Sequence, residues 1–164
     1  MKRIALLITS ALLCFSMNAQ IQRKFFGCTL GESKINEVEH TLKKADISFE
    51  KGRENIEATS VEFGGYAWDK VVFHFYEKKL YEIFFYCRDY MGLRKSHIAK
   101  RIESIGKTLE DKYLNFMVKK DDEGYLFSDD KTSLNLKNGE SIIVLGYVDK
   151  RIMSIKTDRE KDEF

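Results

Sequence analysis

The chain contains no proline, and it has only one tryptophan, three histidines and three cysteines. Without proline it lacks the stiff, extended spacers that commonly separate domains, and no glycine- and serine-rich linker replaces them. Glu37 and His40 have the i, i+3 spacing of carboxylate-bridged metal sites, but no second pair matches them. We therefore expect one compact unit with no metal and no cofactor.

Catalytic motifs are also missing from the chain. It has no Gly-x-Ser-x-Gly elbow, in which a turn presents a nucleophilic serine, and no obvious Cys–His pair. We expect no catalytic residues and a protein that is not an enzyme. A hydrolase remains an alternative, because His74 or His97 could meet a nucleophile in three dimensions.

No apolar run is long enough to cross a membrane, which takes about 20 residues. The run from Ile4 to Phe15 is shorter, follows the basic pair Lys2-Arg3 and precedes Ala19-Gln20. This order is typical of a secretory signal peptide. We expect residues 1–19 to be removed near Ala19-Gln20, which would make the protein periplasmic or secreted, with no membrane span in the mature chain.

The chain also has no large excess of positive or negative charge. The chain has 28 basic and 26 acidic residues, and the leader contains two of the basic ones, Lys2 and Arg3, and none of the acidic ones. The mature chain is therefore close to neutral. A protein that binds nucleic acid or anionic lipid through its net charge needs a basic excess, so we expect no nucleic-acid partner.

Two cysteines, Cys28 and Cys87, remain after removal of the leader. Both lie in apolar segments typical of strands. They can form one disulfide or remain two buried thiols, and an oxidising compartment favours the disulfide.

Apolar periodicity changes twice along the mature chain. Spacing of three to four residues predicts helices at 34–45, with Ser33 as N-cap, and at 95–113. Alternation predicts strands after each helix, and Asp149 is placed to cap a last short helix. The order predicts an α+β fold in which an antiparallel sheet has its helices on one face. We expect residues 20–164 to form a single domain, in which two tandem helix-plus-strands halves, about 20–92 and 93–164, fit side by side.

The clearest hairpin spans 71–87, and its alternation separates two faces. We assign Val71, Phe73, Phe75, Tyr81, Ile83, Phe85 and Cys87 to the core, and Val72, His74, Tyr76, Leu80, Glu82, Phe84 and Tyr86 to an open face. Exposed aromatic patches often mark interaction sites, but these side chains could instead pack against a loop, the tail or another subunit. We add Trp68, just before the hairpin, to the candidate binding residues, although a lone tryptophan beside a turn is more often a core or rim residue.

One motif spans residues 26–42 and reads Phe26-Gly27-x-x-Leu30-Gly31-x-Ser33-x-x-x-x-Val38-x-x-x-Leu42. It resembles the opening of outer-membrane assembly lipoproteins of the SmpA/BamE type, whose helix-then-strands unit is doubled in folds similar to the β-lactamase inhibitory protein. The resemblance implies a periplasmic or secreted domain that grips a protein through a curved sheet, here with His74, Tyr76, Phe84 and Tyr86. The chain differs from those lipoproteins in having no convincing lipidation motif, because Leu13 precedes Cys14.

Together these features predict an exported, noncatalytic module that binds an unknown protein partner through the open face. The alternatives are a structural or assembly accessory of the cell envelope, or a homodimer formed through the same face.

Overall fold

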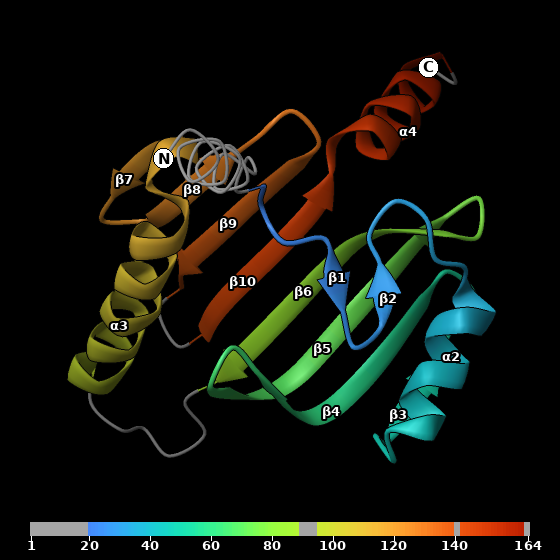
Figure 1. The fold of residues 1–164 in the computed structure, drawn as a ribbon, viewed down its shortest axis with the longest axis horizontal. Coiled ribbons are helices and arrows are strands. Elements are labelled where there is room, and N and C mark those ends of the chain that lie inside the picture. The colour runs from blue at the N-terminus through green and yellow to red at the C-terminus, as the bar shows by residue number, and fades with distance from the viewer. Residues whose placement is uncertain (1–19, 89–94, 140–141, 163–164) are drawn as a thin grey trace, which may run out of the picture.

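The computed structural model describes residues 20–88, 95–139 and 142–162, so the expected leader, residues 1–19, lies outside the described residues. At its centre is one eight-stranded antiparallel sheet in the order β3-β4-β5-β6-β10-β9-β8-β7 (Figure 1). The expected α+β fold is therefore confirmed. The strands are β3 Phe49–Lys51, β4 Asn55–Phe63, β5 Tyr66–Tyr76, β6 Lys79–Arg88, β7 Met117–Asp121, β8 Gly124–Ser128, β9 Thr132–Asn138 and β10 Ile142–Asp149.

The strand order divides the sheet into two meanders. In the first half, helix α2 (Ile35–Lys44) precedes β3 to β6; in the second, helix α3 (Lys95–Tyr113) and a 3-10 turn, η1 (Leu114–Phe116), precede β7 to β10. The last strands of the two meanders, β6 and β10, pair antiparallel at the junction. This is the tandem helix-plus-strands plan that the sequence predicts.

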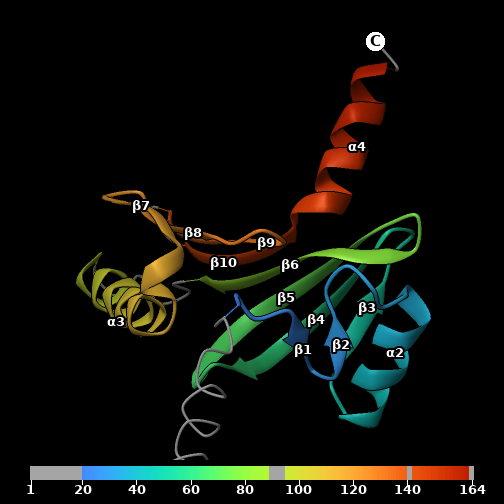
Figure 2. The same cartoon turned by 45° about the horizontal axis from the view of Figure 1, so that its top comes forward.

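Helices α2 and α3 lie on the same side of the sheet, together with a small hairpin of β1 (Lys24–Phe25) and β2 (Cys28–Thr29) (Figures 1 and 2). Helix α4 (Lys150–Asp162) leaves the end of β10 and projects to the opposite side (Figure 2). We call the side under α2, α3 and the small hairpin the covered face, and the other side the open face.

The core lies on the covered face and is centred on Phe85, which has no exposed surface. The ring of Phe63 stacks on that of Phe85 at 4.4 Å, and Trp68 lies 5.5 Å from it. Phe25, from the small hairpin, contacts the ring of Tyr147 edge-on at 4.6 Å. The N-terminal segment therefore closes the core over the junction of the two halves.

Helix α2 begins one residue later than expected. Lys34, not Ser33, is its N-cap residue, and the Glu37 carboxylate accepts a hydrogen bond from the Lys34 backbone N–H at 2.9 Å. Ser33 instead accepts one from the Thr29 N–H at 3.0 Å, which closes the preceding turn. A carboxylate in the first turn also interacts favourably with the helix dipole.

Asp149 caps α4, as the sequence predicts. One carboxylate oxygen accepts the Ile152 N–H at 2.8 Å, and the other accepts Nη2 of Arg23 at 2.5 Å. Arg23 also donates to the Leu30 carbonyl at 2.6 Å and to the Thr132 hydroxyl at 2.8 Å. One buried carboxylate, that of Asp149, thus joins the N-terminal segment to the N-terminus of α4.

Candidate functional site

The open face is built from side chains that strand register brings into line. In β5 and β6, Val72 lies opposite Phe84, and His74 lies opposite Glu82. Strand β10 continues these rows, because Gly146 pairs with Phe84 and Val144 pairs with Tyr86. Side chains directly opposite one another lie on the same face of a sheet. The face therefore combines residues from both halves of the chain.

Three aromatic side chains form a ladder at its centre. The His74 ring meets that of Phe84 edge-on at 5.9 Å, and the rings of Phe84 and Tyr86 are 6.2 Å apart. Each of the three is half-buried. We call His74, Phe84 and Tyr86 the aromatic ladder.

Gly146 makes room for the ladder. A Cβ atom built on Gly146 would lie 2.5 Å from Cε1 of Phe84, a distance far shorter than any normal contact. The Phe84 ring therefore lies directly over the backbone of β10. A glycine here allows an aromatic ring to cross the neighbouring strand.

Charged residues border the ladder toward β4. The Lys70 ammonium lies 5.3 Å from the Tyr86 ring centroid and bonds to the Glu57 carboxylate at 3.1 Å. Burial, followed by the nearby carboxylates of Glu82 and Glu57, raises the pKa of Tyr86. Its phenol therefore stays protonated at neutral pH and can donate a hydrogen bond.

At the other end of β5 and β6, α4 stands beside the open face. Arg159 of α4 forms an ion pair with Glu77 in the β5–β6 turn, and its guanidinium lies 5.9 Å from the Tyr76 ring centroid. The Tyr76 ring is 6.4 Å from that of Tyr81. Tyr76 therefore belongs to the corner between α4 and the sheet rather than to the aromatic ladder.

A β-bulge corrects the expected alternation of β6. His74 pairs with Glu82, whereas the next residue, Phe75, pairs with Leu80, so Tyr81 has no partner across the strands. The extra residue reverses the side-chain order beyond this point. Leu80, expected on the open face, is fully buried with Phe75. Tyr81, expected in the core, is buried, at 7 % exposed, but its ring contacts Tyr76.

Trp68 lies apart from the other four candidate residues. It is 2 % exposed, and its indole N–H donates to the Phe63 carbonyl at 3.1 Å. Its ring packs against Phe85 on the covered face. Trp68 is therefore a core residue, and the open face contains His74, Tyr76, Phe84 and Tyr86 without it.

The expected disulfide is absent. The structure describes both Cys28 and Cys87, and no bond joins them. Cys28 lies in β2 and hydrogen-bonds with Thr41 of α2, whereas Cys87 lies in β6 opposite Ile143. Burial raises the pKa of the Cys28 thiol, which keeps it protonated and unreactive at neutral pH.

A polar hollow of about 440 Å³ lies at the far end of the sheet, over β7, β8 and β9. Lys119 in its wall forms ion pairs with Asp121 and with Glu123, the latter at 3.8 Å. Within the described part of the chain, no group of three or more histidine, cysteine or acidic side chains is arranged to hold a metal ion. The acidic side chains of this hollow thus have a lysine as their partner.

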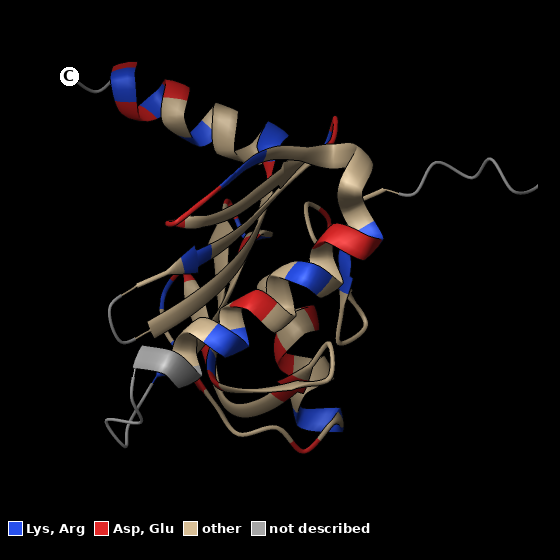
Figure 3. Ribbon diagram, turned by 90° about the vertical axis from the view of Figure 1, so that its left-hand side faces the viewer, with Lys and Arg blue, Asp and Glu red and all other residues tan. Residues whose placement is uncertain are grey.

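In the described part of the chain, catalytic groups do not gather around His74. Among residues 20–88, 95–139 and 142–162, no hydroxyl or thiol hydrogen-bonds to its ring, and its nearest aromatic neighbour is Phe84. Charged residues of both signs interleave along α3 and α4 rather than forming a patch of one sign (Figure 3). None of the helices in the described ranges is long and apolar enough to span a membrane.

Sequence reasoning missed the part of the open face that comes from the second half, namely Gly146 and Val144 of β10. These residues meet the aromatic ladder only because β6 pairs with β10, strands more than fifty residues apart in the sequence. The alternation of 142–148 was the available signal, but alternation does not name the partner strand.

Comparison of the chain with protein-family models, with curated proteins and with solved structures found no match.

Proposed function

We propose that this chain is an exported, noncatalytic module that binds a protein partner through its open face. The observation that carries the proposal is the aromatic ladder, in which three half-buried rings lie side by side on a face that neither α2 nor α3 covers. The solvated side of an antiparallel sheet normally carries polar residues. Rings at such a position are typical of an interaction surface.

The surroundings of the ladder favour a protein over a small ligand. Val144 of β10, half-buried, extends its apolar surface, and the Glu57–Lys70 ion pair borders it. An apolar centre with a polar rim is the usual anatomy of a protein interface. Two cavities lined by described residues lie elsewhere, one at the β7–β9 end and one under α3.

Affinity capture with two matched double variants tests the proposal. The first, Phe84→Ala with Tyr86→Ala, removes two rings of the ladder; the second, Leu114→Ala with Val118→Ala, removes two side chains that are 66 % and 62 % exposed near β7. We expect the wild type and the second variant to retain the same partner from an envelope extract. The ladder variant should retain at least about tenfold less, because truncated hot-spot aromatics dominate interface energy.

Thermal unfolding of the same proteins provides the control, since all three should unfold cooperatively and be fully folded at the temperature of the capture experiment. A partner retained by the ladder variant but lost with Leu114 and Val118 would contradict the proposal and place the interface at the β7 edge.

A second candidate is an assembly role in which the partner is another copy of the chain. It is favoured by α4, which projects beside the open face and carries Met153 and Ile155, 38 % and 43 % exposed. Light scattering of the purified protein distinguishes the two: a dimer that the ladder variant converts to monomer supports self-assembly, and a monomer at all concentrations excludes it.

A further inference from the structure

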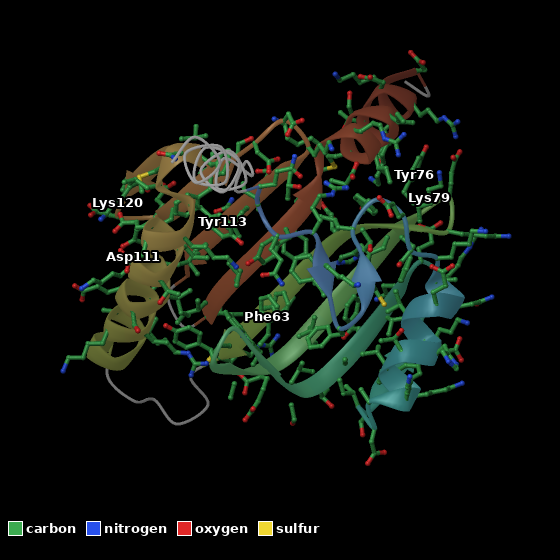
Figure 4. All side chains as sticks on the ribbon, in the orientation of Figure 1. Phe63, Tyr76, Lys79, Asp111, Tyr113 and Lys120 are labelled. Atoms are coloured by element: carbon green, nitrogen blue, oxygen red, sulfur yellow. The ribbon has the colours of Figure 1, made fainter. Side chains whose placement is uncertain are left out.

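A second cavity lies on the covered face, away from the aromatic ladder. It is a pocket of about 80 Å³ between α3, the turn from β4 to β5, and β10. Aromatic rings dominate its wall, contributed by Phe63, Tyr66, Trp68, Tyr113 and Tyr147. In Figure 4, Tyr113 from α3 and Phe63 from the end of β4 both lie in the space between that helix and the strands.

One end of this pocket is polar. The Tyr113 hydroxyl accepts a hydrogen bond from the Gln22 backbone N–H at 3.2 Å. Lys112 donates to the side-chain oxygen of Gln22 at 3.3 Å, and its ammonium lies 5.0 Å from the Tyr113 ring centroid. The N-terminal segment and α3 thus hold one ammonium group beside one phenol.

Tyr147 of β10 contributes to the wall of the pocket. The residue is 2 % exposed, and its hydroxyl makes no hydrogen bond to any described residue. Burial raises its pKa, with a further contribution from the neighbouring Tyr113. The hydroxyl therefore stays protonated. The hydroxyl oxygen is not one of the fully buried polar atoms that lack a partner, so it keeps access to the space of the pocket.

The charges around the pocket have one sign. Lys112 belongs to the described wall, and that wall contains no acidic side chain. Beside it, the guanidinium of Arg101 lies 5.9 Å from the Tyr66 centroid and 6.0 Å from the Trp68 centroid. The Arg101 Nε is buried and has no hydrogen-bond partner among the described residues. An anionic group fits these surroundings, and a cationic one does not.

We propose that this pocket binds a carboxylate carried on a short aliphatic body. The hydroxyls of Tyr147 and Tyr113 and the ammonium of Lys112 would bind the carboxylate, and Ile105, Trp68 and Phe63 would surround the aliphatic part. An engineered apolar cavity of about 150 Å³ in another protein holds benzene, and this pocket of about 80 Å³ has room for roughly half as large a body. It would therefore enclose an aliphatic group of about four carbon atoms at most, with the carboxylate at the polar end beside Lys112. The ligand is either a free short-chain acid or the C-terminal residue of a peptide.

Trp68 reports on the pocket directly, because it is the only tryptophan of the chain and lies in the wall. Titration of the purified protein with 3-methylbutanoate should change its fluorescence saturably, with a dissociation constant on the order of 1 mM for so small a ligand. The matched alcohol and amine, 3-methylbutanol and 3-methylbutylamine, should bind at least about tenfold more weakly, because they lack the charge-assisted hydrogen bonds. Equal binding of acid and alcohol would overturn the proposal, as would no saturable change with the acid.

Two variants separate this site from simple apolar binding. Tyr147→Phe removes one hydroxyl and keeps the ring contacts, and Lys112→Gln removes the charge at the polar end. Each should weaken 3-methylbutanoate binding by about tenfold, whereas the control Lys107→Gln, an exposed position of α3 outside the wall, should not. Tyr147→Phe should leave the thermal midpoint nearly unchanged, because the hydroxyl makes no hydrogen bond to a described residue. Full affinity in both site variants would overturn the assignment of the carboxylate.

N-acetylleucine, which has the same aliphatic group and a carboxylate next to a peptide-like amide, distinguishes the two sources. Tighter binding than that of 3-methylbutanoate identifies a peptide C-terminus, and weaker binding identifies a free acid; both outcomes support the site. The site does not depend on the open face, so loss of carboxylate binding and loss of partner capture are independent results.

Discussion

Phe84 and Phe85 are neighbours on β6, yet they belong to different environments. Phe85 faces α3 and the small hairpin, has no exposed surface, and contacts Phe63, Trp68 and Tyr147. Phe84 faces away from them, is half-buried, and lies over Gly146. The rings on the covered face pack together in the core. The rings on the open face are only half-buried and are not part of the core, which favours binding as their role.

The largest expected effect is the difference between alanine substitutions on the two faces. Phe85→Ala should lower the free energy of unfolding by about 3–5 kcal/mol, because it leaves a cavity among buried rings. Phe84→Ala should cost less than about 1.5 kcal/mol, because the surroundings of a half-buried ring can relax and water can enter. Urea unfolding of both variants measures the difference.

Equal losses for Phe84→Ala and Phe85→Ala would contradict the distinction between the faces. They would mean that another part of the protein, such as α4 or a second copy, covers Phe84 in solution.

The Asp149 carboxylate connects the two faces and gives the next largest effect. Asp149→Ala removes the N-cap of α4, worth about 1 kcal/mol, and leaves Arg23, 18 % exposed, without its carboxylate. Breaking such a partly buried pair adds about 1–2 kcal/mol, less than the loss for a fully buried pair. We expect a total of about 2–3 kcal/mol by urea unfolding.

Asp149→Asn keeps a good capping side chain but removes the charge, so it should recover about 1 kcal/mol relative to alanine. The control is Asp158→Ala on the exposed side of α4, which should change stability by less than about 0.5 kcal/mol. If Asp149→Ala were as mild as this control, α4 would be held by contacts other than its cap.

Local signals explain most of what the sequence predicted correctly. The spacing of Val38 and Leu42 predicts a buried helix stripe, and the structure places both in the core. Likewise Asp149 precedes α4 as its cap. Each of these signals lies within a few residues of the element that it predicts, so no knowledge of the tertiary structure is needed.

Most of the errors come from pairing and packing that alternation and local spacing do not encode. The bulge at Tyr81 shifts β6 by one residue, and a slip of one residue exchanges the faces, which alternation cannot reveal. Trp68 is buried because Phe63 and α3 meet it, and Cys28 is held beside α2 rather than beside Cys87. The pairing of Phe84 with Gly146 depends on β6 meeting β10, a contact between the two halves.

The smallest expected effect comes from adding one methyl group on each side of the sheet. A Cβ on Gly106 of α3 would lie 2.4 Å from Cζ of Tyr125, and a Cβ on Gly146 would lie 2.5 Å from Cε1 of Phe84. The Tyr125 ring lies between α3 and β8, whereas the Phe84 ring can swing into solvent. We expect Gly106→Ala to lower the free energy of unfolding by about 1–2 kcal/mol. Gly146→Ala should lower it by less than about 0.5 kcal/mol, because the alanine also restricts the unfolded chain.

In Gly146→Ala the Phe84 ring should nevertheless move away from the backbone of β10. The loss of nuclear Overhauser effects between Phe84 and β10 would show this movement. Unchanged contacts would mean that the Phe84 ring does not lie over β10, and then the aromatic ladder would not have the geometry on which partner binding depends.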